Sequence, residues 1–155
     1  MPSTQLEDVL NYLAISDTIG TAGQPGPTQF SAIRAAGYDV VVNLAMPDSA
    51  NALPNEQQLV SREGMLYVHI PVVWERPTAQ NLEQFFDVTA RCRGKRVFVH
   101  CAMNMRVSVF VYLYRVIWLG VSQDSARVDL LRIWQPNATW QRFLDDSLAE
   151  YRVQT

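Results

Sequence analysis

Three short apolar segments, separated by helical patterns, constrain the fold of this chain most strongly. They are residues 38–44 (YDVVVNL), 65–73 (MLYVHIPVV) and 96–100 (RVFVH). Short runs rich in Val and Ile predict strands, and nearly continuous apolar strands are typical of sheets that are covered on both faces. Because parallel strands need long crossovers, helices between these segments predict a mostly parallel sheet.

The expected helices are defined by their end signals. Thr28, Thr78, Ser122 and Asn137 stand where N-cap residues belong, and Gly37 stands just after the first helical pattern. A further helix beginning after Arg106 is apolar nearly all round, which places it in the centre of the molecule. The predicted helices cover residues 28–37, 55–64, 78–93, 107–119, 122–134 and 137–153.

Together these elements predict one domain over residues 1–155, of the α/β class. Its mostly parallel sheet of four to five strands is flanked by helices on both faces. Residues 17–22 (DTIGTA) are expected to add a strand at the edge of the sheet.

Composition excludes several classes of function. Hydrophobic residues make up 48% of the 155 residues, charged residues 18%, and the net charge is −2, as in globular proteins. No run rich in Lys or Arg occurs, so we expect no nucleic-acid partner. The most apolar segment, residues 107–120, is interrupted by an arginine and is too short to span a bilayer. We therefore expect no membrane association, and the oligomeric state stays open.

The cysteines and histidines suggest chemistry other than metal binding. Cys92 and Cys101 form no disulfide framework, and both would stay reduced in the cytoplasm, where we expect the protein. The amino terminus lacks the basic and apolar regions of a signal peptide. Only two histidines occur, and no cluster has zinc-binding spacing, so we expect neither metal nor cofactor.

The sequence HCAMNMRVS, residues 100–108, joins the third apolar strand to the apolar helix. Ligands bind beyond the carboxyl ends of parallel strands, which is where Cys101 falls. The N–H groups of such a turn and the N-terminus of the next helix attract anions, and the same field stabilises a thiolate. Arg106 can hold a tetrahedral oxyanion with two N–H groups. We predict a nucleophile at Cys101, with an anion-binding turn formed by the backbone amides of Ala102, Met103, Asn104 and Met105.

These residues resemble the signature loop of the cysteine-dependent phosphatases, the protein-tyrosine and dual-specificity group. The similarity lies in VFVHCAMNMRVS and VFVYLYRV, while TAGQPGPTQFSAIRAAGYDVVVNL and HIPVVWERPT resemble a bacterial set of small tyrosine-phosphatase-like proteins. The resemblance covers residues 18–119. It implies that Cys101 forms a phosphocysteine, that Arg106 binds the phosphoryl oxygens, and that Ser108 assists the leaving thiolate. It also implies that His100 keeps the thiolate poised, and that the substrate is a phosphorylated small molecule or a phosphoprotein.

The loop departs from the phosphatase pattern in three ways. Four residues, in place of five, separate Cys101 from Arg106, and an arginine one place early is rotated by ~100° about the helix axis. The loop contains no glycine, although Ser108 keeps its usual place seven residues after the cysteine. The general acid of these enzymes is an aspartate on an earlier loop, but here Glu75 is the nearest carboxylate and Asp48 the second choice. We therefore expect weak or specialised turnover.

Two other functions fit the same loop. A rhodanese-like sulfurtransferase also begins its active loop with a cysteine at a strand end, and its loop length is closer to the four residues found here. A non-catalytic module that binds phosphate or another anion would explain the missing aspartate and glycine. The residues favour a phosphatase over both, because the His-Cys pair and the extended resemblance point to that group.

Overall fold

The computed structural model describes residues 5–151, and its five strands form one sheet in the order β1-β2-β5-β3-β4. The strands are β1 (Leu13–Ala14), β2 (Ile19–Ala22), β3 (Val40–Asn43), β4 (Leu66–His69) and β5 (Val97–His100). β2, β5, β3 and β4 pair in parallel, and the short β1 runs antiparallel beside β2. The predicted mostly parallel sheet is confirmed.

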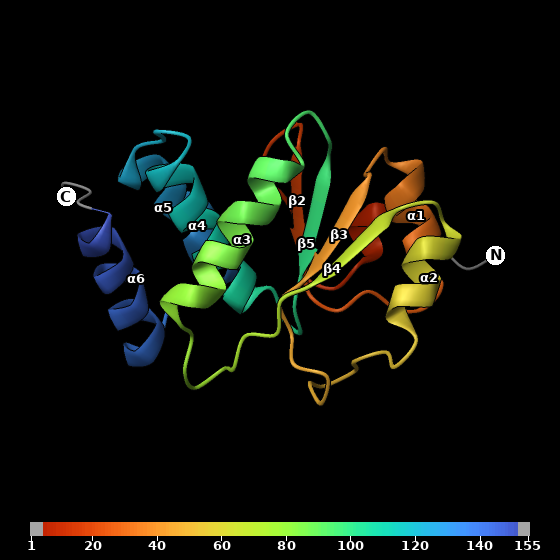
Figure 1. Ribbon diagram of the computed structural model, residues 1–155, viewed down its shortest axis with the longest axis horizontal. Coiled ribbons are helices and arrows are strands. Elements are labelled where there is room, and N and C mark those ends of the chain that lie inside the picture. Colours follow the sequence, from red (N-terminus) through yellow and green to blue (C-terminus); the bar gives the residue numbers. More distant parts are fainter. Residues whose placement is uncertain (1–4, 152–155) are drawn as a thin grey trace.

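Helices cover both faces of this sheet, as predicted (Figure 1). They are η1 (Leu6–Asp8), α1 (Phe30–Ala35), α2 (Glu56–Arg62), α3 (Ala79–Arg91), α4 (Met105–Ile117), α5 (Gln123–Ile133) and α6 (Ala138–Glu150). In Figure 1, α1 and α2 lie on one side of the sheet, and α3, α4, α5 and α6 lie on the other. The last residues of the helix predicted over 137–153 fall outside the described range.

Side chains of the central strands point alternately to the two faces of the sheet and pack into two separate hydrophobic cores. Val41 and Phe98 pack into the smaller core on the side of α1 and α2. Val40, Val42 and Val99 point to the opposite side and pack into the larger core formed with α3 to α6. α4 lies at the centre of that larger core, because nine of its side chains are buried. The uniformly apolar pattern after Arg106 predicted this central position correctly.

Two local predictions are wrong. The strand predicted over residues 17–22 is present as β2, but it does not lie at the edge, because β1 pairs with its outer side and β5 with its inner side. Thr28 does not cap α1, whose N-cap is Gln29 in a helical conformation with no side-chain hydrogen bond to the helix. The chain enters α1 through a turn in which the Gln29 side chain accepts a hydrogen bond from the Gly26 N–H, so no extended cap residue precedes the helix. Thr78, Ser122 and Asn137 cap their helices as predicted.

The carboxyl ends of the parallel strands meet where β5 turns into α4. β5 lies between β2 and β3, so loops from several parts of the chain converge on this turn. The candidate site therefore lies at the carboxyl end of the sheet, where the sequence predicted it.

Within residues 5–151, no helix has the length and apolar character needed to cross a bilayer.

Candidate active site

Cys101 directly follows β5, at the carboxyl end of a central strand, and is 1% exposed. Its backbone N–H donates to the Ala22 carbonyl over 3.4 Å, which continues the pairing of β5 with β2 past the strand end. The cysteine is a free thiol. The fold thus places Cys101 at the carboxyl end of a central strand, as predicted from its place after the third apolar run.

The turn after Cys101 is short because Asn104 takes a left-handed conformation. Asn104 has φ of +69° and forms the N-cap of α4, and its carbonyl accepts the Ser108 N–H over 2.9 Å. Residues with φ above zero are usually glycine, and asparagine is among the few others that adopt this conformation readily. Asn104 therefore supplies the sharp turn for which the sequence shows no glycine.

Neighbouring segments hold the outer side of the turn. The Ala102 carbonyl accepts from the Gln24 N–H over 3.0 Å, and the Met103 carbonyl accepts from Asn11 Nδ2 over 3.1 Å. Asn104 Nδ2 in return donates to the Asn11 carbonyl over 2.9 Å and to Thr21 Oγ1 over 3.1 Å. Since C=O and N–H point in opposite directions across a trans peptide, the Met103 N–H faces away from Gln24.

Gly23 permits this close approach. A Cβ atom at Gly23 would stand 2.6 Å from the Ala102 carbonyl oxygen, well inside van der Waals contact. Gly23 and Met103 also form an isolated antiparallel bridge. Across the described residues, the N–H groups of Ala102, Met103 and Met105 donate to no protein acceptor. These groups are therefore available to a ligand.

Arg106 lies in the first turn of α4 and is nearly buried. Its Nη1 donates to the Val72 carbonyl over 2.9 Å, and its Nη2 donates to Ser49 Oγ over 3.3 Å. The guanidinium carbon lies 5.9 Å from the centre of the Trp74 ring. A guanidinium has five N–H donors, so these two hydrogen bonds leave donors for an anion.

Cys101 and Arg106 share one cavity despite the shortened spacing between them. The volume of this cavity is about 170 Å³. Its lining consists of Trp74, Cys101, Ala102, Met103, Met105 and Arg106. The arrangement places a thiol, a cation and the N-terminus of a 13-residue helix around one space, which is a chemical environment suited to an anion.

His100 lies behind the turn and is completely buried. Its Nε2 is 2.6 Å from Glu56 Oε2, and its Nδ1 is 3.3 Å from the Cys101 carbonyl oxygen. Gln24 Nε2 donates to the other oxygen of Glu56 over 2.8 Å. Neither Glu56 nor Gln24 was predicted as a site residue; the one signal in the sequence was the Gly-Gln-Pro turn, residues 23–25, within the resemblance.

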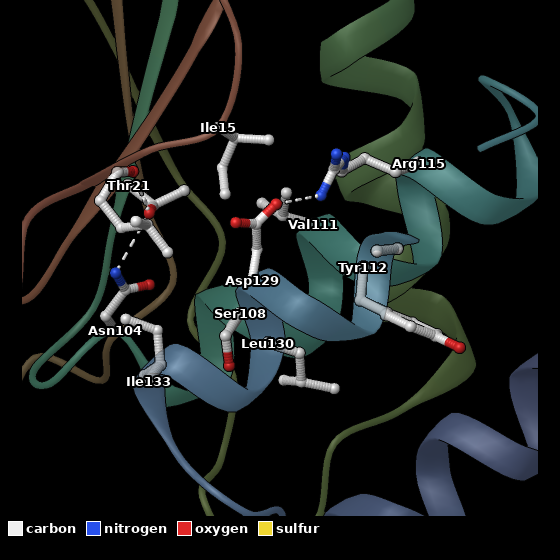
Figure 2. Close-up of a pocket in the computed structure, with 12 residues that line it drawn as sticks. Ile15, Thr21, Asn104, Ser108, Val111, Tyr112, Arg115, Asp129, Leu130 and Ile133 are labelled. Atoms are coloured by element: carbon white, nitrogen blue, oxygen red, sulfur yellow. Dashed lines mark hydrogen bonds and ion pairs between the residues drawn. The ribbon is translucent and has the colours of Figure 1, made fainter. Parts of the chain in front are cut away.

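Ser108 faces a different part of the molecule. Its hydroxyl donates to the Met105 carbonyl over 2.6 Å and accepts from Trp134 Nε1 over 2.9 Å. Figure 2 shows Ser108 beside a second, small cavity of about 10 Å³, together with Asn104 and the ion pair of Arg115 and Asp129. Ser108 does not line the cavity of Cys101. Its assistance to the leaving thiolate stays a prediction.

The two predicted acids lie on loops that touch Arg106. Glu75 follows Trp74, whose ring faces the guanidinium, and Asp48 precedes Ser49, whose hydroxyl accepts from it. Both carboxylates are exposed, and neither lines the cavity of Cys101. A choice between them as general acid stays a prediction. In the described part of the chain, no group of three or more His, Cys, Asp or Glu side chains is arranged to hold a metal ion.

Comparison with known proteins identifies the class to which this fold and site belong. Residues 16–143 match the family described as "DSP-PTPase phosphatase fused to NAD+ Kinase", and the chain belongs to that family. It is thus a member of the tyrosine and dual-specificity phosphatase superfamily, as the resemblance of its loop indicated.

Two solved structures are similar to this chain over most of its length. A DUF442 protein from Shewanella putrefaciens CN-32 is 33% identical, with a TM-score of 0.85 over 94% of this chain and 96% of its own. The core catalytic domain of the PP-IP phosphatase SIW14 from S. cerevisiae shares the fold at 13% identity, with a TM-score of 0.73 over 89% of this chain and 87% of its own.

A curated relative is much longer than this chain. The "Beta-lactamase hydrolase-like protein" of Xylella fastidiosa (strain Temecula1 / ATCC 700964) is 29% identical over 122 residues, which make up 75% of this chain. The match covers 27% of the relative, so the chain spans about a quarter of the length of that protein.

Proposed function

We propose that this protein is a cysteine-dependent phosphatase that hydrolyses a phosphoester through a phosphocysteine on Cys101. The observation that carries the proposal is the cavity that Cys101 shares with Arg106 at the N-terminus of α4. Membership of the phosphatase family supports the same reaction. We further propose that residues 1–155 act as one phosphatase-like domain.

The proposed reaction has two steps. In the first, the Cys101 thiolate attacks phosphorus, a P–S bond forms and the ester P–O bond breaks, and the leaving oxygen takes a proton from a general acid. In the second, water attacks phosphorus, the P–S bond breaks, and the thiolate and inorganic phosphate are released. Arg106 and the amides of Ala102, Met103, Asn104 and Met105 hold the phosphoryl oxygens in both steps.

We expect slow turnover because neither candidate general acid lies in the cavity, where it could protonate the leaving group. Glu75 is our first choice for the general acid and Asp48 the second, and both are exposed carboxylates outside the cavity. The Ser108 hydroxyl is engaged by Met105 and Trp134, so any help to the leaving thiolate needs a change of partners. The enzyme is thus suited to substrates whose leaving group needs little protonation.

The partner of this site is a phosphorylated small molecule or a phosphoprotein. An oxyanion is the one feature that the cavity specifies, through Arg106 and the free N–H groups of the turn. The thiolate must stay reduced to act, and both cysteines are free thiols. We therefore propose that the protein works in a reducing compartment such as the cytoplasm.

The deciding experiment traps the covalent intermediate. The protein is mixed with p-nitrophenyl phosphate, quenched in acid and digested, and the mass of the peptide that contains Cys101 is measured. We expect a phosphorylated cysteine, a burst of nitrophenolate, and loss of both in Cys101→Ser. Cys92→Ser is the matched control, because Cys92 is also a buried free thiol but lies outside the site; it should retain activity.

Two results would contradict the proposal. A persulfide on Cys101 after incubation with thiosulfate, with transfer of sulfur to cyanide and no phosphoester hydrolysis, would identify a sulfurtransferase. Phosphate binding that persists in Cys101→Ser, with no turnover of any phosphoester by the unmodified protein, would identify a non-catalytic anion-binding module.

A further inference from the structure

A buried acid–base pair lies directly behind the turn of the candidate site. Glu56 is the first residue of α2, His100 is the last residue of β5, and Glu56 Oε2 lies 2.6 Å from His100 Nε2. The side chain of His100 is 0% exposed and that of Glu56 is 3% exposed. Burying two ionisable groups is unfavourable unless each is hydrogen-bonded, and both side chains of this pair have hydrogen-bond partners.

The hydrogen-bond partners indicate which ring nitrogen of His100 faces the turn. His100 Nδ1 faces the Cys101 carbonyl, which can only accept, so Nδ1 carries a hydrogen. The other ring nitrogen, Nε2, lies 2.6 Å from Glu56 Oε2. Gln24 Nε2 donates to the remaining oxygen of Glu56. In this arrangement His100 donates to the Cys101 carbonyl through Nδ1 while Nε2 is held by Glu56.

This donor sets the direction of the peptide that follows the nucleophile. Because C=O and N–H are opposed across a trans peptide, holding the Cys101 carbonyl toward His100 turns the Ala102 N–H the other way. Ala102 lines the cavity of Cys101, so its N–H is turned toward the anion site. Gln24 acts on the next peptide as well, since its backbone N–H holds the Ala102 carbonyl over 3.0 Å.

We propose that Glu56, supported by Gln24, is a positioning residue: it fixes the His100 ring so that the amides after Cys101 face the anion and stabilise the thiolate. This inference rests on the proposed function, because it concerns the same nucleophile. The residue acts through His100 and touches neither the thiol nor the substrate.

Other titratable groups near the pair do not replace it. Burial raises the pKa of Tyr67 to about 12, and the charge of Glu56 and a side-chain hydrogen bond to Glu56 add to the rise, so Tyr67 stays neutral near pH 7. The Tyr67 hydroxyl accepts from Asn43 Nδ2 over 3.1 Å. His69 lines the same cavity as Glu56 but directs Nε2 to the Ala45 carbonyl over 2.6 Å. Among the described residues, His100 is the group that forms the ion pair with Glu56.

The test measures how fast iodoacetamide alkylates Cys101 as a function of pH, in a Cys92→Ser background that leaves one thiol. We expect Glu56→Ala to slow alkylation about tenfold near pH 6.5 and to move the midpoint of the profile up by about one pH unit. Glu56→Gln should stay within about threefold, because its carboxamide can accept from Gln24 and donate to His100 Nε2. Glu63→Gln, at the other end of α2, is the matched control.

Each outcome decides the inference. An unchanged profile in a folded Glu56→Ala protein overturns it, and so does a Glu56→Gln protein as impaired as Glu56→Ala. If Glu56→Ala does not fold, Gln24→Met must shift the profile in the same direction, and the absence of a shift overturns the inference. Alkylation needs no phosphoester turnover, so this test gives a result even if no phosphocysteine forms and the proposed function fails.

Discussion

At the scale of single residues, Asn104 explains how a turn without glycine can be this tight. Its backbone is left-handed, and its side chain ties the turn to Asn11 and Thr21. Glycine would permit the turn but make neither hydrogen bond, and most other residues would be strained there. Asn104 therefore both adopts the left-handed conformation and anchors the turn by side-chain hydrogen bonds.

This dual role predicts different effects for two substitutions at Asn104. Asn104→Gly keeps the conformation and loses the hydrogen bonds, each of which is worth about 1 kcal/mol. Asn104→Ala loses the same bonds and adds a strain of about 1–2 kcal/mol from its positive φ. We expect the alanine variant to have the lower thermal midpoint and the weaker phosphate affinity, measured by calorimetry. Equal effects of the two substitutions would show that the left-handed conformation is unimportant.

What the sequence revealed about the site depended on distance along the chain. Cys101 and Arg106 lie five positions apart, between a recognisable strand and helix, so their shared site could be predicted. Glu56 is 44 residues away from His100, and only the folded sheet brings them together. The position of Ser108 fitted the phosphatase pattern by count. Its hydroxyl is nevertheless directed by Trp134, a contact that spacing cannot show.

At the scale of elements, the four-residue strands were predictable and the two-residue β1 was not. The Val-rich segments that became β3 and β5 are buried at every position, so their apolar runs were unambiguous. β1 has two residues, too few for any periodicity, and its absence from the prediction left β2 misplaced at the edge. The predicted caps succeeded where an extended Thr, Ser or Asn precedes the helix.

Asp39 connects three of these elements and predicts how stability depends on pH. It precedes β3, accepts from the Arg96 N–H before β5 over 3.0 Å, and accepts from Arg34 of α1 over 3.2 Å. The Arg96 hydrogen bond, followed by the Arg34 hydrogen bond and charge, lowers the pKa of Asp39 below its ordinary value of 3.8. A lowered folded-state pKa stabilises the protein above the unfolded pKa, and this stabilisation is lost as pH falls.

We therefore expect Asp39→Asn to melt at a lower temperature than the unmodified protein at pH 7. The difference should shrink as pH falls from about 5 to about 3, because Asp39 becomes protonated in the unfolded chain over that range. Thermal melts across this range provide the measurement. Asp87→Asn, on an exposed position of α3, serves as the control and should show no such trend. A constant difference at all pH values would refute the assignment.

At the scale of the whole molecule, the candidate site is supported from both faces of the sheet. On one face, α2 contributes Glu56 behind the turn. On the other, α5 ends beside Trp134, which donates to Ser108, and α6 contributes Trp140, whose Nε1 donates to the Trp74 carbonyl over 2.9 Å. The Trp74 ring packs on Trp134 and Trp140 and faces Arg106. The two C-terminal helices thus contact the candidate site through Trp74.

Trp140→Phe tests whether this support matters for function. The variant keeps an aromatic ring in the larger core but loses the hydrogen bond to the Trp74 carbonyl, so the loop that holds Arg106 should loosen. We expect the free energy of unfolding to fall by about 1–3 kcal/mol from the lost hydrogen bond and the smaller ring. Phosphate affinity should also fall, by about threefold to tenfold, an effect of about 0.7–1.4 kcal/mol. Trp118→Phe is the control, because Trp118 is 60% exposed and lies outside the site. Unchanged phosphate affinity in a destabilised Trp140→Phe protein would mean that the C-terminal helices stabilise the fold without shaping the anion site.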